Sequence, residues 1–164
     1  MLSHLRQVIY VMSNHGYLKD PQWYLAFVAG IGFWFLVNYF VLPANPQNLL
    51  NTPDIILFSI LLYPLLEEIV FRGLIQGQLM WRLYWGRCYL GISRANLVTS
   101  SLFALLHTVY QASLMSVLVI FPSLIFGYFR DRHRSVYPSI WLHVFYNAGF
   151  FTLFYGVSLD VGLN

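Results

Sequence analysis

The chain has 164 residues, of which 59% are hydrophobic, 19% aromatic and only 9% charged. A soluble domain of this length needs more polar surface over its core, so this composition argues against one and predicts a polytopic membrane protein. The net charge of +3 does not indicate nucleic-acid binding, because the basic residues are scattered between apolar segments and form no dense patch.

The first 20 residues are expected to form an interfacial segment ahead of the membrane domain. Leu2, Leu5, Ile9 and Met12 recur at helical spacing beside polar side chains, which predicts an amphipathic helix within residues 1–19. A signal peptide is not expected, because the apolar stretch is short and no small-residue cleavage site follows it.

Five membrane spans are expected in a single domain of residues 21–164. Their limits follow from prolines, polar breakers and the ends of apolar runs. The expected spans cover 21–42, 54–84, 96–110, 112–129 and 137–156. Pro64 is expected to free a backbone carbonyl and kink the second span, and Pro122 interrupts the fourth. The fold class is therefore predicted as an all-α, polytopic transmembrane helical bundle.

The basic residues predict the orientation of this bundle. Segments 1–20, 85–95 and 130–136, with the ragged end of the second span near Arg82, contain eight of the nine Lys and Arg residues. The loop 43–53 and the turn near Gln111 contain none. By the positive-inside rule, the N-terminus is cytoplasmic and the C-terminus lies outside.

Ionisable and polar side chains inside the expected spans are the strongest functional signal, because burying them in a bilayer is costly. The helical rise puts four of them about 9–16 Å from the cytoplasmic face, in one layer. These four are Glu67, His107, His143 and Asn147. Each alone could be a structural hydrogen-bonding residue. Together they predict a shared site.

Spacing within the helices indicates which polar side chains share a helical face and which do not. Glu68 and Arg72 are four residues apart, so they share a helical face and can form an ion pair. Glu67 is rotated by about 100° from Glu68, so it can face a different neighbour and is the carboxylate expected to act in catalysis. His143 and Asn147 are also four residues apart and offer two donors on one face.

Three motifs in order carry a family resemblance. Glu67–Glu68–Ile–Val–Phe–Arg72 fits EExxxR, Phe103–Ala–Leu–Leu–His107 fits FxxxH, and His143–Val–Phe–Tyr–Asn147 fits HxxxN. They resemble the CPBP family of intramembrane proteases, which includes CaaX-prenyl endopeptidases and enzymes linked to bacteriocin processing and self-immunity. The resemblance covers a motif core of residues 54–156.

The resemblance implies an intramembrane endopeptidase of the glutamic type. In it, Glu67 and His107 would activate the attacking water, and His143 and Asn147 would stabilise the oxyanion. The supporting residues would be Glu68, Arg72 and Phe103. No cofactor is expected. Zinc held by Glu67, His107 and His143 is the alternative, although HExxH is absent and Asn147 is an unusual zinc ligand.

The expected substrate is a membrane-associated protein or peptide, with cleavage near its C-terminus as one option. CaaX endopeptidases tend to be longer than this chain, which favours a small processing enzyme in the bacterial inner membrane. The expected partners are this substrate and the lipid bilayer, and the oligomeric state is left open. Two other functions remain in view: a non-catalytic immunity or partner-binding membrane protein on the same fold, and a proton-coupled carrier, which the lack of an inverted repeat disfavours.

Overall fold

The computed structural model describes residues 16–40, 49–81, 85–86, 88–89, 91–112 and 114–155. Its first elements are the short helix η1 (Gly16–Lys19) and α2 (Pro21–Phe40). Asp20 caps α2, since its Oδ1 accepts a hydrogen bond from the Gln22 N–H at 3.0 Å. Pro21 occupies the first helical position, where its missing N–H has no cost.

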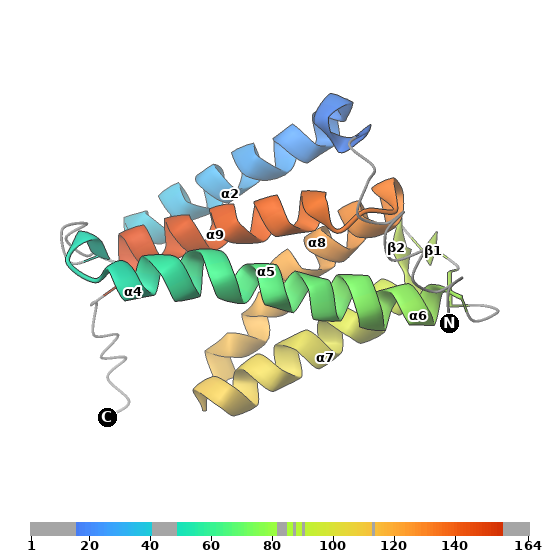
Figure 1. Cartoon of the computed structure of the whole chain (residues 1–164). Coiled ribbons are helices and arrows are strands. Elements are labelled where there is room, and N and C mark those ends of the chain that lie inside the picture. The colour runs from blue at the N-terminus through green and yellow to red at the C-terminus, as the bar shows by residue number, and fades with distance from the viewer. Residues whose placement is uncertain are drawn as a thin grey trace.

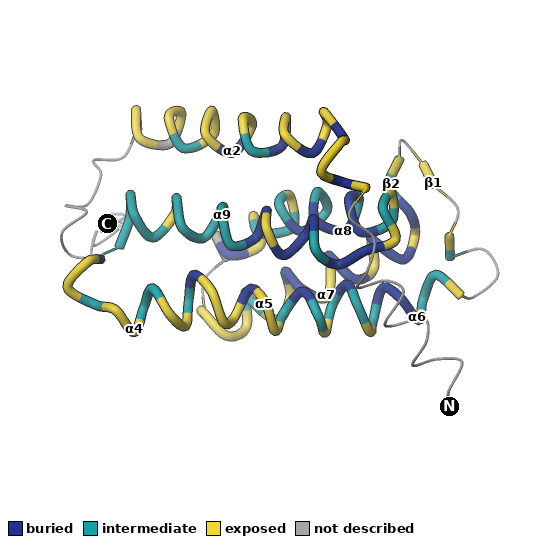
Figure 2. Tube along the Cα trace, turned by 45° about the horizontal axis from the view of Figure 1, so that its top comes forward, coloured by how far each residue is buried: buried dark blue, intermediate teal, exposed yellow. Residues whose placement is uncertain are grey.

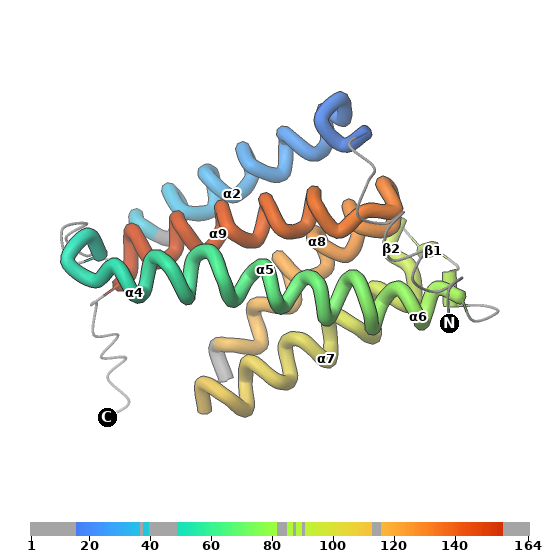
Figure 3. Tube along the Cα trace, in the orientation of Figure 1, coloured from blue at the N-terminus to red at the C-terminus, as the bar shows by residue number. Residues whose placement is uncertain are grey.

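The next segment is one continuous helix over residues 53–80, which Figures 1 and 3 show running beside the C-terminal helix. Its parts are α4 (Pro53–Ile55), η2 (Ile56–Leu62), α5 (Tyr63–Glu68), η3 (Ile69–Gln76) and α6 (Gly77–Met80). Both η2 and η3 are π-helical. The helix continues through Pro64 because the preceding stretch is π-helical, and the Tyr63 N–H there donates to the Phe58 carbonyl five residues back.

A short antiparallel hairpin precedes the second half of the bundle. Its strands are β1 (Cys88–Tyr89) and β2 (Ile92–Ser93), in a region where sequence analysis expected only a loop. Ser93 then caps α7 (Arg94–Gln111), because its side chain accepts a hydrogen bond from the Asn96 N–H at 3.0 Å. The remaining elements are η4 (Leu114–Val119), α8 (Ile120–His133) and α9 (Tyr137–Phe154).

The helix α9 lies at the centre of the bundle and packs against α2, α8 and the 53–80 helix. α7 packs on α8 and on η3. Two side-chain hydrogen bonds tie α2 to α9: Trp23 Nε1 donates to the Pro138 carbonyl at 3.1 Å, and the Tyr146 hydroxyl donates to the Ala26 carbonyl at 2.8 Å. Figure 2 shows the buried segments gathered along α8 and its neighbours, whereas much of α2 is exposed.

The all-α class is confirmed, and four of the five expected helices lie close to their predicted positions. The fourth is shifted: α8 begins at Ile120 and continues to His133, so Pro122 lies in its first turn, where a missing N–H leaves no gap in the helix. Arg130, expected in a loop, is therefore helical, and it is buried. That expectation was wrong, and the physical reason is an acceptor for its guanidinium, described below.

The expected membrane spans are not confirmed in the same way. Within the described ranges, no helix is both long enough and apolar enough to cross a membrane. Of the expected interfacial helix, residues 1–15 lie outside the described residues, and 16–19 form η1.

Candidate active site

Glu67 and Glu68 end α5 and differ sharply in exposure. The side chain of Glu68 is fully buried, whereas 31% of the Glu67 side chain is exposed. Adjacent helical residues point about 100° apart, so one carboxylate enters the bundle and the other stays at its edge. The structure thus divides the two glutamates as their spacing predicted.

Arg72 forms the predicted ion pair with Glu68. Its Nε lies 3.3 Å from Glu68 Oε2, and both side chains are fully buried. One terminal guanidinium nitrogen also donates to Ser123 of α8, to the carbonyl at 2.8 Å and to the hydroxyl at 2.6 Å. The guanidinium carbon lies 5.5 Å from the centroid of the Phe103 ring, within cation–π range. Phe103 therefore contacts the arginine of this pair.

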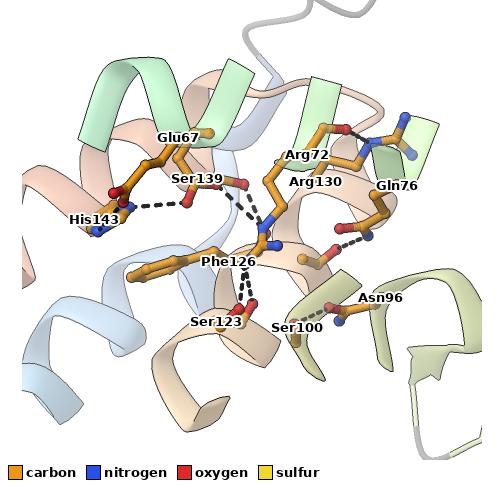
Figure 4. Close-up of polar contacts among 12 residues, drawn as sticks. Glu67, Arg72, Gln76, Asn96, Ser100, Ser123, Phe126, Arg130, Ser139 and His143 are labelled. Atoms are coloured by element: carbon orange, nitrogen blue, oxygen red, sulfur yellow. Dashed lines mark hydrogen bonds and ion pairs between the residues drawn. The ribbon is translucent and has the colours of Figure 1, made fainter. Parts of the chain in front are cut away.

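His143 contacts both glutamates, one through each ring nitrogen. Its Nδ1 lies 2.9 Å from Glu68 Oε1, and its Nε2 lies 3.7 Å from Glu67 Oε2. Its ring stacks on Phe126, with centroids 4.9 Å apart and planes at 24°. Figure 4 shows the Glu67 carboxylate pointing toward the His143 ring. The contact to Glu68 fixes the orientation of the imidazole, a role that helical spacing did not reveal.

His107 lies on α7 and is half-buried. Its Nδ1 is 3.0 Å from the Phe103 carbonyl one turn earlier, and its ring lies against the Phe103 ring with centroids 4.2 Å apart. In the described part of the chain it makes no hydrogen bond or ion pair with Glu67, so the expected pairing of these two residues stays a prediction.

Asn147 contacts the backbone of the glutamate helix. Its Nδ2 donates to the Ser59 carbonyl at 2.9 Å. Asn147 lies one turn after His143 on α9, and Ser59 lies in η2 ahead of the glutamates. The two α9 residues therefore tie α9 to the 53–80 helix at two levels. An oxyanion-binding role for Asn147 stays a prediction.

These residues lie within the segment that a family model recognises. The model for the type II CAAX prenyl endopeptidase Rce1-like family matches residues 50–149. The chain belongs to this family. No curated protein and no solved structure gives a significant match.

The family segment contains all three motifs, from Glu67 to Asn147, and excludes α2. The resemblance seen in the sequence is therefore confirmed at the level of the family. The 53–80 helix lies wholly inside it and α9 lies inside it as far as residue 149, whereas α2, which packs against α9, lies outside.

Several polar residues that sequence analysis did not single out form hydrogen bonds between the helices around the motif residues. Arg130 Nε donates to the Arg72 carbonyl at 3.0 Å, and this acceptor explains why a cation is buried at the end of α8. Gln76, one turn after Arg72, donates to the Gly127 carbonyl at 3.0 Å. Asn96 of α7 donates to the Leu124 carbonyl at 2.9 Å.

Small residues four apart on α8 were the one available signal for this layer. Ser123 and Gly127 have the spacing that lets helices approach closely. A side chain on Gly127 would overlap the Asn96 carboxamide. The sequence pattern could indicate a close approach, but it could not name the arginines and amides that fill it.

The zinc alternative concerns the same side chains. Among the described residues, no group of three or more His, Cys, Asp or Glu side chains is arranged to hold a metal ion. The ring nitrogens of His143 face Glu68 and Glu67, and the Nδ1 of His107 faces the Phe103 carbonyl. The expectation of no cofactor stays a prediction, and zinc remains its alternative.

Proposed function

We propose that this chain is an intramembrane endopeptidase in which Glu67 activates the water that attacks a peptide bond. The supporting observation is the unequal placement of the two glutamates. Glu68 is fully buried and contacts both Arg72 and His143, whereas Glu67 is partly exposed and faces only the far side of the imidazole. A base must reach water and substrate, and Glu67 is the carboxylate of the pair that can.

The reaction we propose is a general-base hydrolysis. Glu67 takes a proton from water as the water oxygen attacks the carbonyl carbon, and it then returns the proton to the leaving amide nitrogen. His107 of α7 acts with Glu67 in activating this water. His143, held at Nδ1 by Glu68, and Asn147 are the two hydrogen-bond donors that stabilise the oxyanion.

The rest of the cluster holds these groups in place. Arg72 neutralises Glu68 at 3.3 Å, so that the buried carboxylate can orient His143 without leaving an uncompensated charge. Phe126 supports the imidazole from its face. This preorganisation is what makes donors effective in a site from which water is largely excluded.

We further propose that the protein is embedded in the bacterial inner membrane through the five expected spans, with the N-terminus cytoplasmic. The support is a composition that is 59% hydrophobic and 9% charged, together with the membership of a prenyl-endopeptidase family. The substrate we propose is a membrane-associated protein or peptide.

The test compares protein termini in native membranes that contain wild type or Glu67→Gln at matched abundance, measured by mass spectrometry. Asp54→Asn is the control, since it removes an exposed carboxylate from the same helix outside the site. New termini with wild type and Asp54→Asn, absent with Glu67→Gln, would support the protease and identify the bond. Identical termini in all three membranes, with every protein inserted, would favour the immunity or partner-binding alternative.

A further inference from the structure

The hydrogen bond between Asn147 and the Ser59 carbonyl fills a gap in the backbone of the glutamate helix. In η2 the N–H groups donate five residues back, as Tyr63 does to Phe58 at the end of the stretch. The N–H that would reach Ser59 in this register belongs to residue 64. That residue is Pro64, which has no N–H.

The Ser59 carbonyl therefore needs a partner from outside its own helix. A backbone carbonyl without one is costly in an apolar environment, and a neighbouring helix commonly supplies it. Here the supplier is Asn147 Nδ2, at 2.9 Å. This amide lies one turn from His143, and Pro64 lies one turn before Glu67, so the contact joins the two segments that carry the site.

The same contact fixes the Asn147 carboxamide. An amide group has two N–H bonds, and the one that binds Ser59 determines the direction of the other. Of the polar contacts described for Asn147, this is the only hydrogen bond. Its geometry thus depends on a carbonyl that a proline keeps available.

We propose that Pro64 and Asn147 form one positioning unit: Pro64 withholds the N–H that would occupy the Ser59 carbonyl, and Asn147 binds that carbonyl and holds α9 against the glutamate helix. In this role Pro64 is a positioning residue that touches no reacting atom. The effect on catalysis rests on the proposed protease function, whereas the effect on stability does not.

A double-mutant cycle tests the unit in the purified full chain. The variants are Pro64→Ala, Asn147→Ala and the two combined. Alanine is a good helix former, so Pro64→Ala keeps the helix and adds an N–H. The matched control is Pro122→Ala, alone and with Asn147→Ala, because Pro122 is a helical proline of α8 that takes no part in the Ser59–Asn147 contact.

The first measurement is the thermal midpoint of unfolding. Asn147→Ala should lower it by about 2–4 °C in the wild-type background, because the part-buried Ser59 carbonyl loses its partner. In the Pro64→Ala background the loss should fall to less than half, because the alanine N–H then serves the carbonyl. In the Pro122→Ala background, Asn147→Ala should lower the thermal midpoint by as much as it does in the wild-type background. Equal losses in all three backgrounds would overturn the proposal.

The second measurement is cleavage of the substrate found in the native-membrane comparison. Pro64→Ala alone should lower kcat by about 3–10-fold with KM unchanged, since the contact positions the site and does not bind substrate. In the Asn147→Ala background the same change should alter kcat less than about twofold. If the kcat losses of Pro64→Ala and Asn147→Ala instead multiply in the double variant, the two residues act independently and the proposed unit is wrong. If wild type itself cleaves nothing, the protease proposal fails. The thermal midpoints of the double-mutant cycle still show whether Pro64 and Asn147 act as one unit.

Discussion

Two clusters in this molecule combine the same three residue types, a carboxylate, an arginine and a histidine. In the buried cluster, Glu68 lies between Arg72 Nε at 3.3 Å and His143 Nδ1 at 2.9 Å. In the other, Asp20 lies between Arg132 Nε at 2.5 Å and His133 Nε2 at 2.9 Å. Even the stacking is repeated, because each histidine lies on a phenylalanine of α8.

The two clusters differ in burial and in what faces the histidine. Glu68 and Arg72 are fully buried, whereas 42% of the Arg132 side chain is exposed. In the buried cluster, the second nitrogen of the imidazole faces Glu67, whose side chain is partly exposed. Asp20 instead caps α2 and ties it to the end of α8. The two clusters share their residue types, and a second, partly exposed carboxylate is present in only one of them among the described residues.

The largest expected effect separates the clusters by activity. Glu67→Gln should slow formation of the product terminus by about 100–10,000-fold, the range for loss of a general base, with little change in the thermal midpoint. Asp20→Asn should leave the rate within about twofold. The measurement is product terminus formed per unit time at equal enzyme abundance. A Glu67→Gln protein that cleaves at the wild-type rate would remove Glu67 from the proposed mechanism.

The next effect separates the clusters by stability. Arg72→Leu should lower the free energy of unfolding by about 3–5 kcal/mol, because it leaves the Glu68 carboxylate buried without its arginine. Arg132→Leu should cost about 0–1 kcal/mol, because the Arg132 side chain is 42% exposed and solvent screens its charge. Denaturant unfolding of both proteins measures the difference. Similar losses would mean that burial does not distinguish the two clusters.

A smaller effect concerns pH at the Asp20 cluster. Burial alone would raise the pKa of Asp20, but hydrogen bonds from Arg132, the Gln22 N–H and His133 outweigh it and lower this pKa below its ordinary value. The folded state therefore favours the charged carboxylate. This contribution is present above the ordinary pKa of about 4 and is lost as the pH falls through the lower, folded-state value.

Asp20→Asn keeps the cap of α2 and removes the charge, so it isolates this contribution. At pH 7 the variant should be less stable than wild type by about 0.5–1 kcal/mol, and the difference should vanish in acid. Unfolding free energies from pH 7 down to about pH 3 follow the change. A difference that stays constant over this range would show that the charge contributes nothing.

The smallest effect is expected at Cys88, an exposed thiol in β1 that lies outside both clusters. Cys88→Ser should change the free energy of unfolding by less than about 0.5 kcal/mol, as surface substitutions usually do. Cleavage should be unchanged, which an assay beside wild type would check. A variant that loses cleavage would point to a thiol nucleophile and away from Glu67.

Local spacing predicted the parts of the site that lie within one helix. The rotation between Glu67 and Glu68 and the i, i+4 ion pair of Glu68 with Arg72 both follow from helical geometry. The contact of His143 with Glu68 depends on how two helices cross, and no local spacing encodes that. The sequence motifs supplied the candidate residues, whose roles stay predictions, and the tertiary packing decides which of them meet.

The fold was predictable to the same extent. Long apolar runs predicted most helices. A cation at the end of an apolar run usually marks the start of a loop, which predicts a loop at Arg130, but Arg130 is helical. Its buried partner, the Arg72 carbonyl, comes from a helix far along the chain. The β1–β2 hairpin was not foreseen, because strands of two residues are too short to show a period.

The close approach of Asn96 to Gly127 limits the size of the residue at position 127. The Asn96 carboxamide fills the space that a side chain on Gly127 would need, and it is anchored to the Leu124 carbonyl. A larger residue at position 127 would collide with this carboxamide and push α7 away from α8. Because α7 carries His107 and α8 carries Phe126, the glycine at position 127 also fixes how closely these two parts of the candidate site can approach.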